Sequence, residues 1–312
     1  MKIPFEKLLI ASASLFLSEA VSASSIFTGF HSFGDSLTDS GNVFTASNGA
    51  FGYPGGRFSD GPIWAERLAT EYLGLASHTP TIFDGTNHAW GGARTADVVP
   101  PLELSTIPPS ISRQISFYVG SGGSFSSDDL VSIWGGPNDF IDSIDSGLGT
   151  ADPATSAATI GSSIDAVIAA GAEHVMILNV PDLGDTPSYR NGPFEAVATT
   201  WTDDFNAALA SEVIARESAD VTLYFVDIHA LGADFQANPE DYNLLNVVDP
   251  VFPDNLLDPT TTAFWDDLHP TQAVHEIFAR EAAIALGIPE PSSIFLILAS
   301  PALLMTRRQR LA

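Results

Sequence analysis

Three residues suited to acyl transfer lie in two widely separated stretches of this 312-residue chain. Ser36 is in FGDSLTDSGN, and Asp266 and His269 are in FWDDLHPT. A serine hydroxyl becomes a nucleophile when an imidazole takes its proton, and the imidazole needs a carboxylate to fix its tautomer. Asp266 and His269 are three positions apart, so one tight turn can set the carboxylate against Nδ1. Two alternatives stay open: Ser36 as a helix N-cap, and Asp267 as the orienting acid.

Acyl transfer also needs hydrogen-bond donors for the oxyanion that forms. The backbone N–H groups of Ser36 and Gly92 and the side-chain amide of Asn138, in GGPND, could supply three. Gly91 is the alternative to Gly92, and the Asn138 stretch could be an ordinary turn. The G-x-S-x-G pattern of α/β-hydrolases does not occur in this chain. A serine hydrolase built from these residues is therefore of another kind.

The elements that must position these residues alternate between short apolar strands and helices. Near-continuous apolar strands predict a parallel sheet covered by helices on both faces. Ligands of such sheets lie beyond the carboxyl ends of the strands, where the glycine-rich stretches occur. The predicted strands are 26–33, 87–90, 130–134, 174–180 and 221–228, and the predicted helices are 62–73, 111–119, 154–170, 201–217 and 271–286.

Composition narrows the function classes. The chain has 38 acidic and 12 basic residues, for a formal net charge of -26. Such a charge repels nucleic acid, so we expect no nucleic-acid partner. The absence of cysteine excludes a Cys nucleophile and a zinc–thiolate site. With 45% hydrophobic residues and no internal repeat, residues 24–287 are predicted to form one domain.

The two ends carry targeting patterns. Residues 1–23 combine Lys2 and Lys7 with a short apolar run and small residues at a cleavage site, which predicts a signal peptide. Residues 288–312 contain Pro289-Glu290-Pro291, the apolar stretch 292–305 and an arginine cluster. This tail resembles the PEP-CTERM sorting signal of exported bacterial proteins. The resemblance implies a short transmembrane helix, processing by signal peptidase and an exosortase-type enzyme, and a place in the cell envelope or outside the cell.

Four blocks in order resemble the GDSL lipase and esterase family of the SGNH hydrolases: FGDSLTDSGN, NHAWGGA, GGPND and FWDDLHPT. The stretches 53–69 and 178–187 (LNVPDLGDTP) are also similar to the family. The resemblance implies a flavodoxin-like three-layer α/β/α sandwich with a five-stranded, mainly parallel sheet, and ester hydrolysis without a cofactor. It implies Ser36 as nucleophile, His269 as base oriented by Asp266, and Ser36, Gly92 and Asn138 as the oxyanion hole.

Other polar residues receive simpler interpretations. Asp35, Asp39 and Asn42 are expected to hydrogen-bond the backbone of their loop. Arg57 is expected to pin its loop to an acid, with an anionic substrate group as the alternative, and no metal site is predicted, although the acidic run 247–258 could bind calcium. The histidines other than His269 are expected to be structural or exposed: His31, His78, His88, His174, His229 and His275.

Three functions remain open at this level. The leading one is an exported serine carboxylic-ester hydrolase that acts on acyl or lipid esters or on acetylated polysaccharide. The alternatives are an acyltransferase that uses the same site and a non-catalytic binding protein of the envelope or matrix.

Overall fold

The computed structural model describes residues 27–53, 55–97, 108–147 and 149–289. Its central sheet has four parallel strands in the order β1-β2-β3-β4. Phe30 lies opposite Leu130, and Ile133 lies opposite Ile177. The strands β2 and β3 are mostly buried because helices cover both faces, as their apolar sequences predict. The strands are β1 (Gly29–Gly34), β2 (Asp129–Trp134), β3 (His174–Leu178) and β4 (Thr222–Val226).

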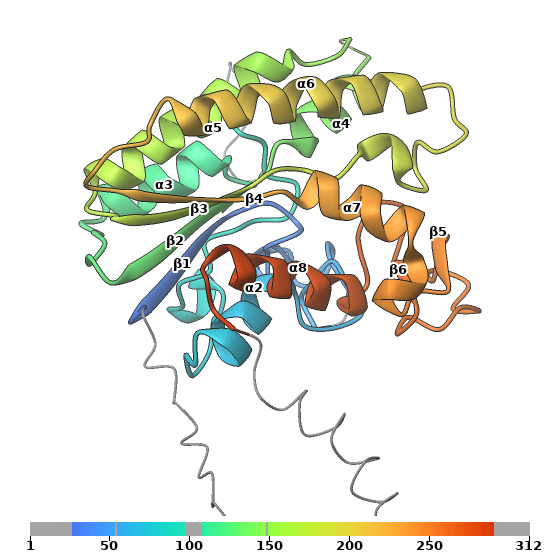
Figure 1. Cartoon of the computed structure of the whole chain (residues 1–312), viewed down its shortest axis with the longest axis horizontal. Coiled ribbons are helices and arrows are strands. Elements are labelled where there is room, and N and C mark those ends of the chain that lie inside the picture. Colours follow the sequence, from blue (N-terminus) through green and yellow to red (C-terminus); the bar gives the residue numbers. More distant parts are fainter. Residues whose placement is uncertain (1–26, 54, 98–107, 148, 290–312) are drawn as a thin grey trace, which may run out of the picture.

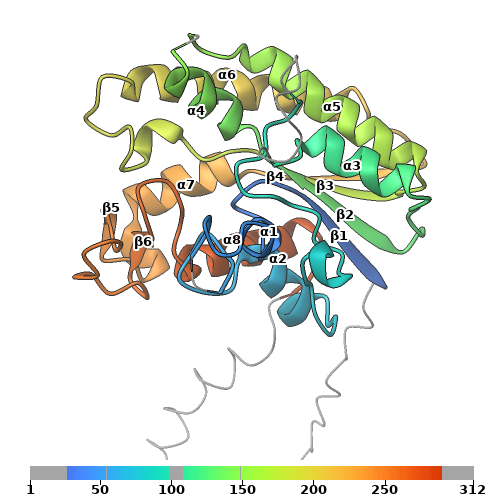
Figure 2. The ribbon, with the colours of Figure 1, turned by 180° about the vertical axis from the view of Figure 1, so that it is seen from behind.

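Two layers of helices enclose the sheet, so the expected three-layer α/β fold is confirmed (Figures 1 and 2). One face carries α3 (Ile111–Gly120), α4 (Pro137–Asp145), α5 (Pro153–Ala169) and α6 (Glu195–Ile214). The other face carries α2 (Trp64–Arg67) and α8 (Gln272–Ala285). Two further helices follow strands: α1 (Asn42–Ala46) comes after β1, and α7 (Ile228–Ala237) comes directly after β4.

Trp134 joins the sheet to the layer formed by α2 and α8. Its ring packs edge-on against Trp64, with centroids 5.5 Å apart, and against Phe278 at the same distance. All three side chains are buried, and the indole N–H of Trp134 donates to the Asn179 carbonyl at 2.9 Å. Apolar burial and a satisfied polar group therefore fix the sheet at the point where β2 and β3 end.

The predicted second strand, 87–90, forms only isolated parallel bridges, in which Asn87 pairs with Ser32 and with Pro80. The segment runs beside β1 because the N–H groups of His88 and Trp90 donate to Ser32 and Gly34. The Asn87 side chain accepts from the N–H of Ala89 and donates to Thr38, which diverts it from a regular ladder. In the part of the chain that the structure describes, the sheet thus has four strands instead of five.

Other elements differ in extent from the predictions. The helix predicted at 62–73 is divided into α2 and a π-helical turn at Leu68–Tyr72. The helix predicted at 201–217 begins at Glu195, and α4 and α7 were not predicted. A small parallel sheet, β5 (Asn246–Pro250) and β6 (Thr262–Phe264), leads into the loop that carries Asp266 and His269.

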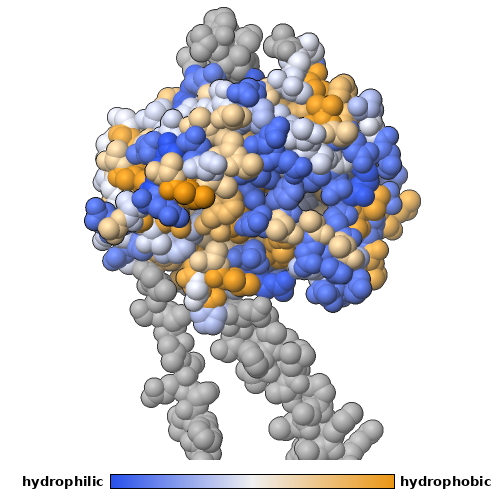
Figure 3. Space-filling view, turned by 45° about the horizontal axis from the view of Figure 1, so that its top comes forward, coloured by the Kyte–Doolittle hydropathy of each residue, from blue (hydrophilic) through white to orange (hydrophobic). Residues whose placement is uncertain are grey.

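The predicted signal peptide, residues 1–23, lies outside the described residues, as does the sorting segment beyond residue 289. In the described ranges, no helix combines the length and the apolarity that crossing a membrane requires. Hydrophilic and hydrophobic residues alternate over the face seen in Figure 3.

Buried imidazoles make the fold sensitive to acid. Burial lowers the pKa of His78, His88 and His275 to about 3 in each case. An imidazole of the unfolded chain takes up a proton below roughly pH 6.5, whereas these three stay neutral until the pH is far lower. Each neutral imidazole therefore stabilises the fold at pH values above about 6.5. This contribution to the free energy of unfolding is lost as the pH falls from about 6.5 to about 3. Burial raises the pKa of Asp35 to about 7. The folded chain then holds a proton that the unfolded chain lacks, so Asp35 increases the stability of the fold as the pH falls from roughly 7 to 4.

A His88→Phe variant isolates one such contribution. His88 stacks on Phe33 with centroids 4.5 Å apart, so a phenyl ring keeps the packing and removes the titrating group. We expect the free energy of unfolding to fall less steeply with acidification, by about 1.4 kcal/mol per pH unit relative to wild type. Urea titrations of both proteins at pH 6 and pH 5 measure this difference. Parallel pH dependences for the two proteins would contradict it.

Candidate active site

Ser36 lies directly beyond the carboxyl end of β1. The carbonyl of Asp35 accepts hydrogen bonds from the N–H groups of Thr38 and Asp39, which closes a tight turn around Ser36. Gln114 of α3 holds the end of the strand, because its side-chain amide exchanges two hydrogen bonds with Gly34. The serine hydroxyl is therefore presented by a fixed turn, with its side chain partly exposed.

The structure brings Ser36, His269 and Asp266 together. His269 Nε2 lies 2.9 Å from Ser36 Oγ, and His269 Nδ1 lies 2.8 Å from Asp266 Oδ2. Asp266 Oδ1 accepts the backbone N–H groups of Leu268 at 2.8 Å and His269 at 2.7 Å. The side chain of Asp267 is exposed, so the rival orienting acid does not occupy this position.

The Asp266 carboxylate is held in its charged form. Burial acts to raise its pKa, but hydrogen bonds from His269, Tyr53 and the Leu268 N–H outweigh burial and lower the pKa to about 2. The Tyr53 hydroxyl donates to Asp266 Oδ2 at 2.6 Å. A carboxylate that stays ionised keeps the proton of neutral His269 on Nδ1 and stabilises the imidazolium when it forms.

Gly92 is better placed than Gly91 to donate to an oxyanion. The N–H of Gly91 is already bound to Asp39 Oδ2 at 2.8 Å, and Gly91 is buried. Gly92 is exposed and has a φ of +78°, a conformation that glycine adopts easily. Neither Ser36 N–H nor Gly92 N–H donates to a described acceptor. Both residues line one cavity together with Asn138.

Two acids, the buried Asp39 and the half-buried Asp139, assemble the loops around this cavity. Asp39 accepts the N–H groups of Gly41, Asn42, Val43 and Gly91. These bonds tie the loop that carries Ser36 to the loop that carries Gly91 and Gly92. Asp139 accepts hydrogen bonds from the N–H and the hydroxyl of Thr95. These bonds tie the segment that carries Asn138 to the loop that follows Gly92.

Asn138 and its neighbour Asp35 complete this part of the site. The Asn138 amide donates to the Ala93 carbonyl at 3.0 Å and lies 3.5 Å from Asp35. Asp35 and Asp39 both accept N–H groups of their own loop, and the Asn42 amide donates to the Asn87 and Ala89 carbonyls. The expectation that they hydrogen-bond the backbone of their own loop is thus confirmed for Asp35 and Asp39, whereas the Asn42 side chain binds the backbone of the segment beside β1.

The cavity beside Ser36 has a volume of about 280 Å³. Its walls are largely apolar, which suits the carbon skeleton of an ester. Sequence reasoning missed two residues here: Tyr53, which supports Asp266, and His229, which lines the cavity although it was expected to be structural or exposed. The apolar walls include Leu37, Phe58, Ile141, Leu183, Phe264 and Leu268.

Arg57 behaves as a structural group. Arg57 forms an ion pair with Glu66 and donates to the Gly55 carbonyl, so it pins its loop as expected. Among the described residues, no group of three or more His, Asp or Glu side chains is arranged to hold a metal ion.

Comparison with known proteins identifies the family. A match to the GDSL-like lipase/acylhydrolase family covers residues 32–282. The chain belongs to this family. The matched range contains Ser36, Gly92, Asn138, Asp266 and His269. The family is named for lipases and acylhydrolases, which are enzymes that hydrolyse acyl bonds.

Individual relatives of the family are more distant. The chain is 27% identical to the phosphatidylcholine-sterol acyltransferase of Aeromonas hydrophila, over 68% of this chain and 62% of that protein. It is also 27% identical to the protein of the trpE-trpG intergenic region of Pseudomonas putida, over 92% of this chain and 53% of the relative. The chain thus spans little more than half the length of these relatives.

A solved structure shares the fold. An acetylxylan esterase from Geobacillus stearothermophilus superposes with a TM-score of 0.51 at 16% identity, over 86% of this chain and 99% of that one. At this identity the likeness concerns the fold.

Proposed function

We propose that this protein is a serine carboxylic-ester hydrolase that works through an acyl-enzyme on Ser36. The observation that carries the proposal is the hydrogen-bonded series from Ser36 Oγ to His269 Nε2 at 2.9 Å and from His269 Nδ1 to Asp266 at 2.8 Å. In the first step, Ser36 Oγ attacks the ester carbonyl while its proton passes to His269 Nε2. The imidazolium then gives this proton to the leaving alcohol as the ester C–O bond breaks.

The second half of the cycle uses the same residues. His269 takes a proton from water, the resulting hydroxide attacks the acyl carbonyl, and the proton returns to Ser36 Oγ as the carboxylic acid leaves. In both halves, we assign the N–H groups of Ser36 and Gly92 to the oxyanion. The Asn138 amide adds a third donor by giving up its long 3.5 Å contact with Asp35. Each such donor contributes about 3 kcal/mol to transition-state stabilisation in comparable sites.

Transfer of the acyl group to another alcohol is the second candidate. The same acyl-enzyme can transfer its acyl group if an alcohol instead of water attacks, and the relative from Aeromonas hydrophila is named as an acyltransferase.

The test is a panel of carboxylic esters from acetyl to long acyl chains, including acetylated glycans, assayed with and without an added alcohol. We expect free acid from at least one ester. Acyl transfer in excess of hydrolysis at low alcohol concentration would favour the transferase, and a folded protein inactive on every ester would favour a binding protein.

We also propose that the protein is exported and then processed at both ends. The support is the signal-peptide pattern of residues 1–23 and the PEP-CTERM-like pattern of residues 288–312. Mass spectrometry of envelope-associated protein from a host with the processing enzymes should find an N-terminus near Ser24 and no peptide that contains Arg310. Recovery of the intact C-terminal tail would contradict C-terminal processing.

A further inference from the structure

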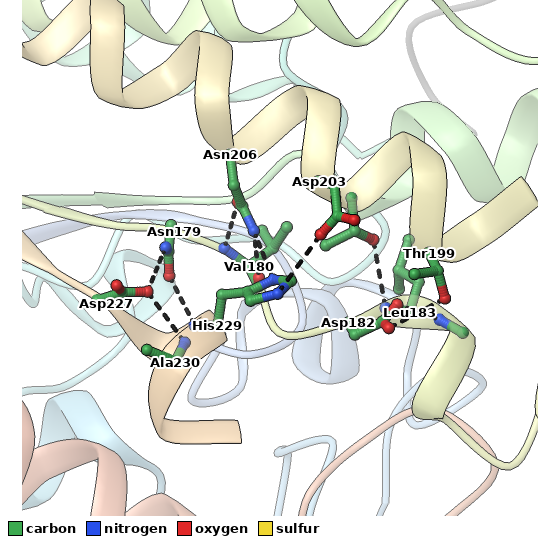
Figure 4. Close-up of polar contacts among 12 residues, drawn as sticks. Asn179, Val180, Asp182, Leu183, Thr199, Asp203, Asn206, Asp227, His229 and Ala230 are labelled. Carbon is green, nitrogen blue, oxygen red and sulfur yellow. Dashed lines mark hydrogen bonds and ion pairs between the residues drawn. The ribbon is translucent and has the colours of Figure 1, made fainter. Parts of the chain in front are cut away.

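A second imidazole lies on the wall of the catalytic cavity. His229, at the start of α7, shares the cavity lining with Ser36 and His269. The segment after β3, from Pro181 to Thr186, forms the neighbouring part of this wall. This segment belongs to LNVPDLGDTP, a stretch that the proposed reaction steps do not use. Figure 4 shows the polar contacts around it.

Asn206 fixes the tautomer of His229. The Val180 N–H donates to Asn206 Oδ1 at 3.0 Å, and Asn206 Nδ2 donates back to the Val180 carbonyl at 2.8 Å. This exchange defines which end of the amide carries hydrogen. The same Nδ2 lies 3.0 Å from His229 Nδ1, so Nδ1 must act as the acceptor. The proton of the neutral imidazole is therefore on Nε2.

The backbone of His229 is held as firmly as its ring. The His229 N–H donates to Asn179 Oδ1 at 2.9 Å, and Asn179 Nδ2 donates to Asp227 Oδ1 at 2.7 Å. Asp227 also accepts the Ala230 N–H as the cap of α7. Three side chains, one in α6 and one just beyond the end of each of β3 and β4, thus position one imidazole (Figure 4). A histidine that was merely exposed would need no such support.

The Nε2 atom of His229 has one described partner, and the contact is long. It lies 3.5 Å from Asp203 Oδ1, and the Asp203 side chain is 61% exposed. This separation is too long for a strong hydrogen bond. Because this contact with Asp203 is weak, a ligand oxygen in the cavity that His229 lines can replace it as the acceptor of the Nε2–H.

The surroundings of His229 define the chemistry of that oxygen. Asp182 and Asp185 lie on the same wall, and only Asp185 has a cationic partner, Arg190 at 3.3 Å. Both oxygens of Asp182 are used, by the Gly184 N–H and the Thr199 hydroxyl. These carboxylates repel an anionic group, and an acyl chain placed here would leave the Nε2–H unpaired. An uncharged hydroxyl group is not repelled by the carboxylates, and its oxygen can accept the Nε2–H.

We propose that His229 is a specificity-determining residue whose Nε2–H binds a free hydroxyl on the alcohol part of the ester. The substrates it favours are then esters of neutral polyols, such as sugars or glycerol. This inference rests on the proposed ester hydrolysis and adds the class of alcohol. One neutral hydrogen bond at a partly exposed site corresponds to about a tenfold preference.

Two butyrate esters with different alcohols test the proposal. Glyceryl monobutyrate carries free hydroxyl groups and ethyl butyrate has none, while the acyl group is the same. In His229→Phe, which keeps an aromatic ring, the ratio of kcat/KM for glyceryl over ethyl butyrate should fall about tenfold, mainly through KM. His229→Gln retains an N–H donor and should restore part of the ratio. His174→Phe, outside the cavity, should leave it unchanged.

The outcomes separate the two proposals. If the His229→Phe protein is folded by circular dichroism and keeps the wild-type ratio within about twofold, the role of His229 is refuted while ester hydrolysis stands. If wild type hydrolyses neither these butyrates nor any ester of the panel, the proposed function fails and the role of His229 fails with it.

Discussion

Replacing Ser36 with alanine should lower kcat/KM for a p-nitrophenyl ester by about 10⁴- to 10⁶-fold, because no covalent intermediate can then form. The fold should persist, since Ser36 is partly exposed and its hydroxyl has no described hydrogen bond other than that with His269. Residual activity above the buffer rate is expected, because the oxyanion donors and the cavity remain. Initial rates over a range of substrate concentrations, with circular dichroism to check folding, measure the effect.

Ser40 provides a matched control for this variant. It lies in the same loop, and its hydroxyl accepts a hydrogen bond from Asn87 at 3.0 Å without contacting His269. Ser40→Ala should therefore cost some stability but keep kcat within about tenfold of wild type. If Ser36→Ala is no less active than Ser40→Ala, Ser36 is not the nucleophile.

Asp266→Asn should lower kcat by about 10⁴-fold, through the wrong tautomer of His269. Asp266 Oδ1 accepts two backbone N–H groups, so the oxygen of an asparagine amide would take that position. Its NH₂ group would then face Tyr53 and His269 Nδ1, where Oδ2 is now. A donor at this point makes Nδ1 an acceptor and puts the proton on Nε2, which can no longer take the proton of Ser36.

Asp267→Asn tests the rival assignment in the adjacent position. The Asp267 side chain is exposed, and no described interaction joins it to His269. This variant should retain activity within about twofold of wild type at neutral pH. Equal losses in the Asp266 and Asp267 variants would contradict the orienting role assigned to Asp266 alone.

Local spacing explains why much of the site was predictable from sequence. Asp266 and His269 are close because one turn carries both, and Ser36 follows a strand whose apolar run is plain in the sequence. Gly92 and Asn138 also follow segments that run along the sheet, so the topology of a parallel sheet brings them to the same edge. The alternation of strands and helices was sufficient to predict the fold class.

Residues that act through tertiary contacts could not be predicted in this way. The Tyr53 hydroxyl donates a hydrogen bond to Asp266, which lies 213 positions later in the sequence, and no local pattern predicts that contact. His229 resembles any histidine at the start of a helix until Asn206, 23 positions earlier, is seen to fix its ring. The segment 87–90 has the composition of a strand, but the side chain of Asn87 binds backbone groups instead.

Labelling with a fluorophosphonate probe tests the central claim most directly. The probe phosphonylates a serine only where the hydroxyl is activated, so it reports the nucleophile without assuming a substrate. Peptide mapping of the labelled wild-type protein should place one adduct on Ser36, and the folded Ser36→Ala protein should remain unlabelled. An unlabelled wild-type protein, or equal labelling of the Ser36→Ala variant, would contradict the account.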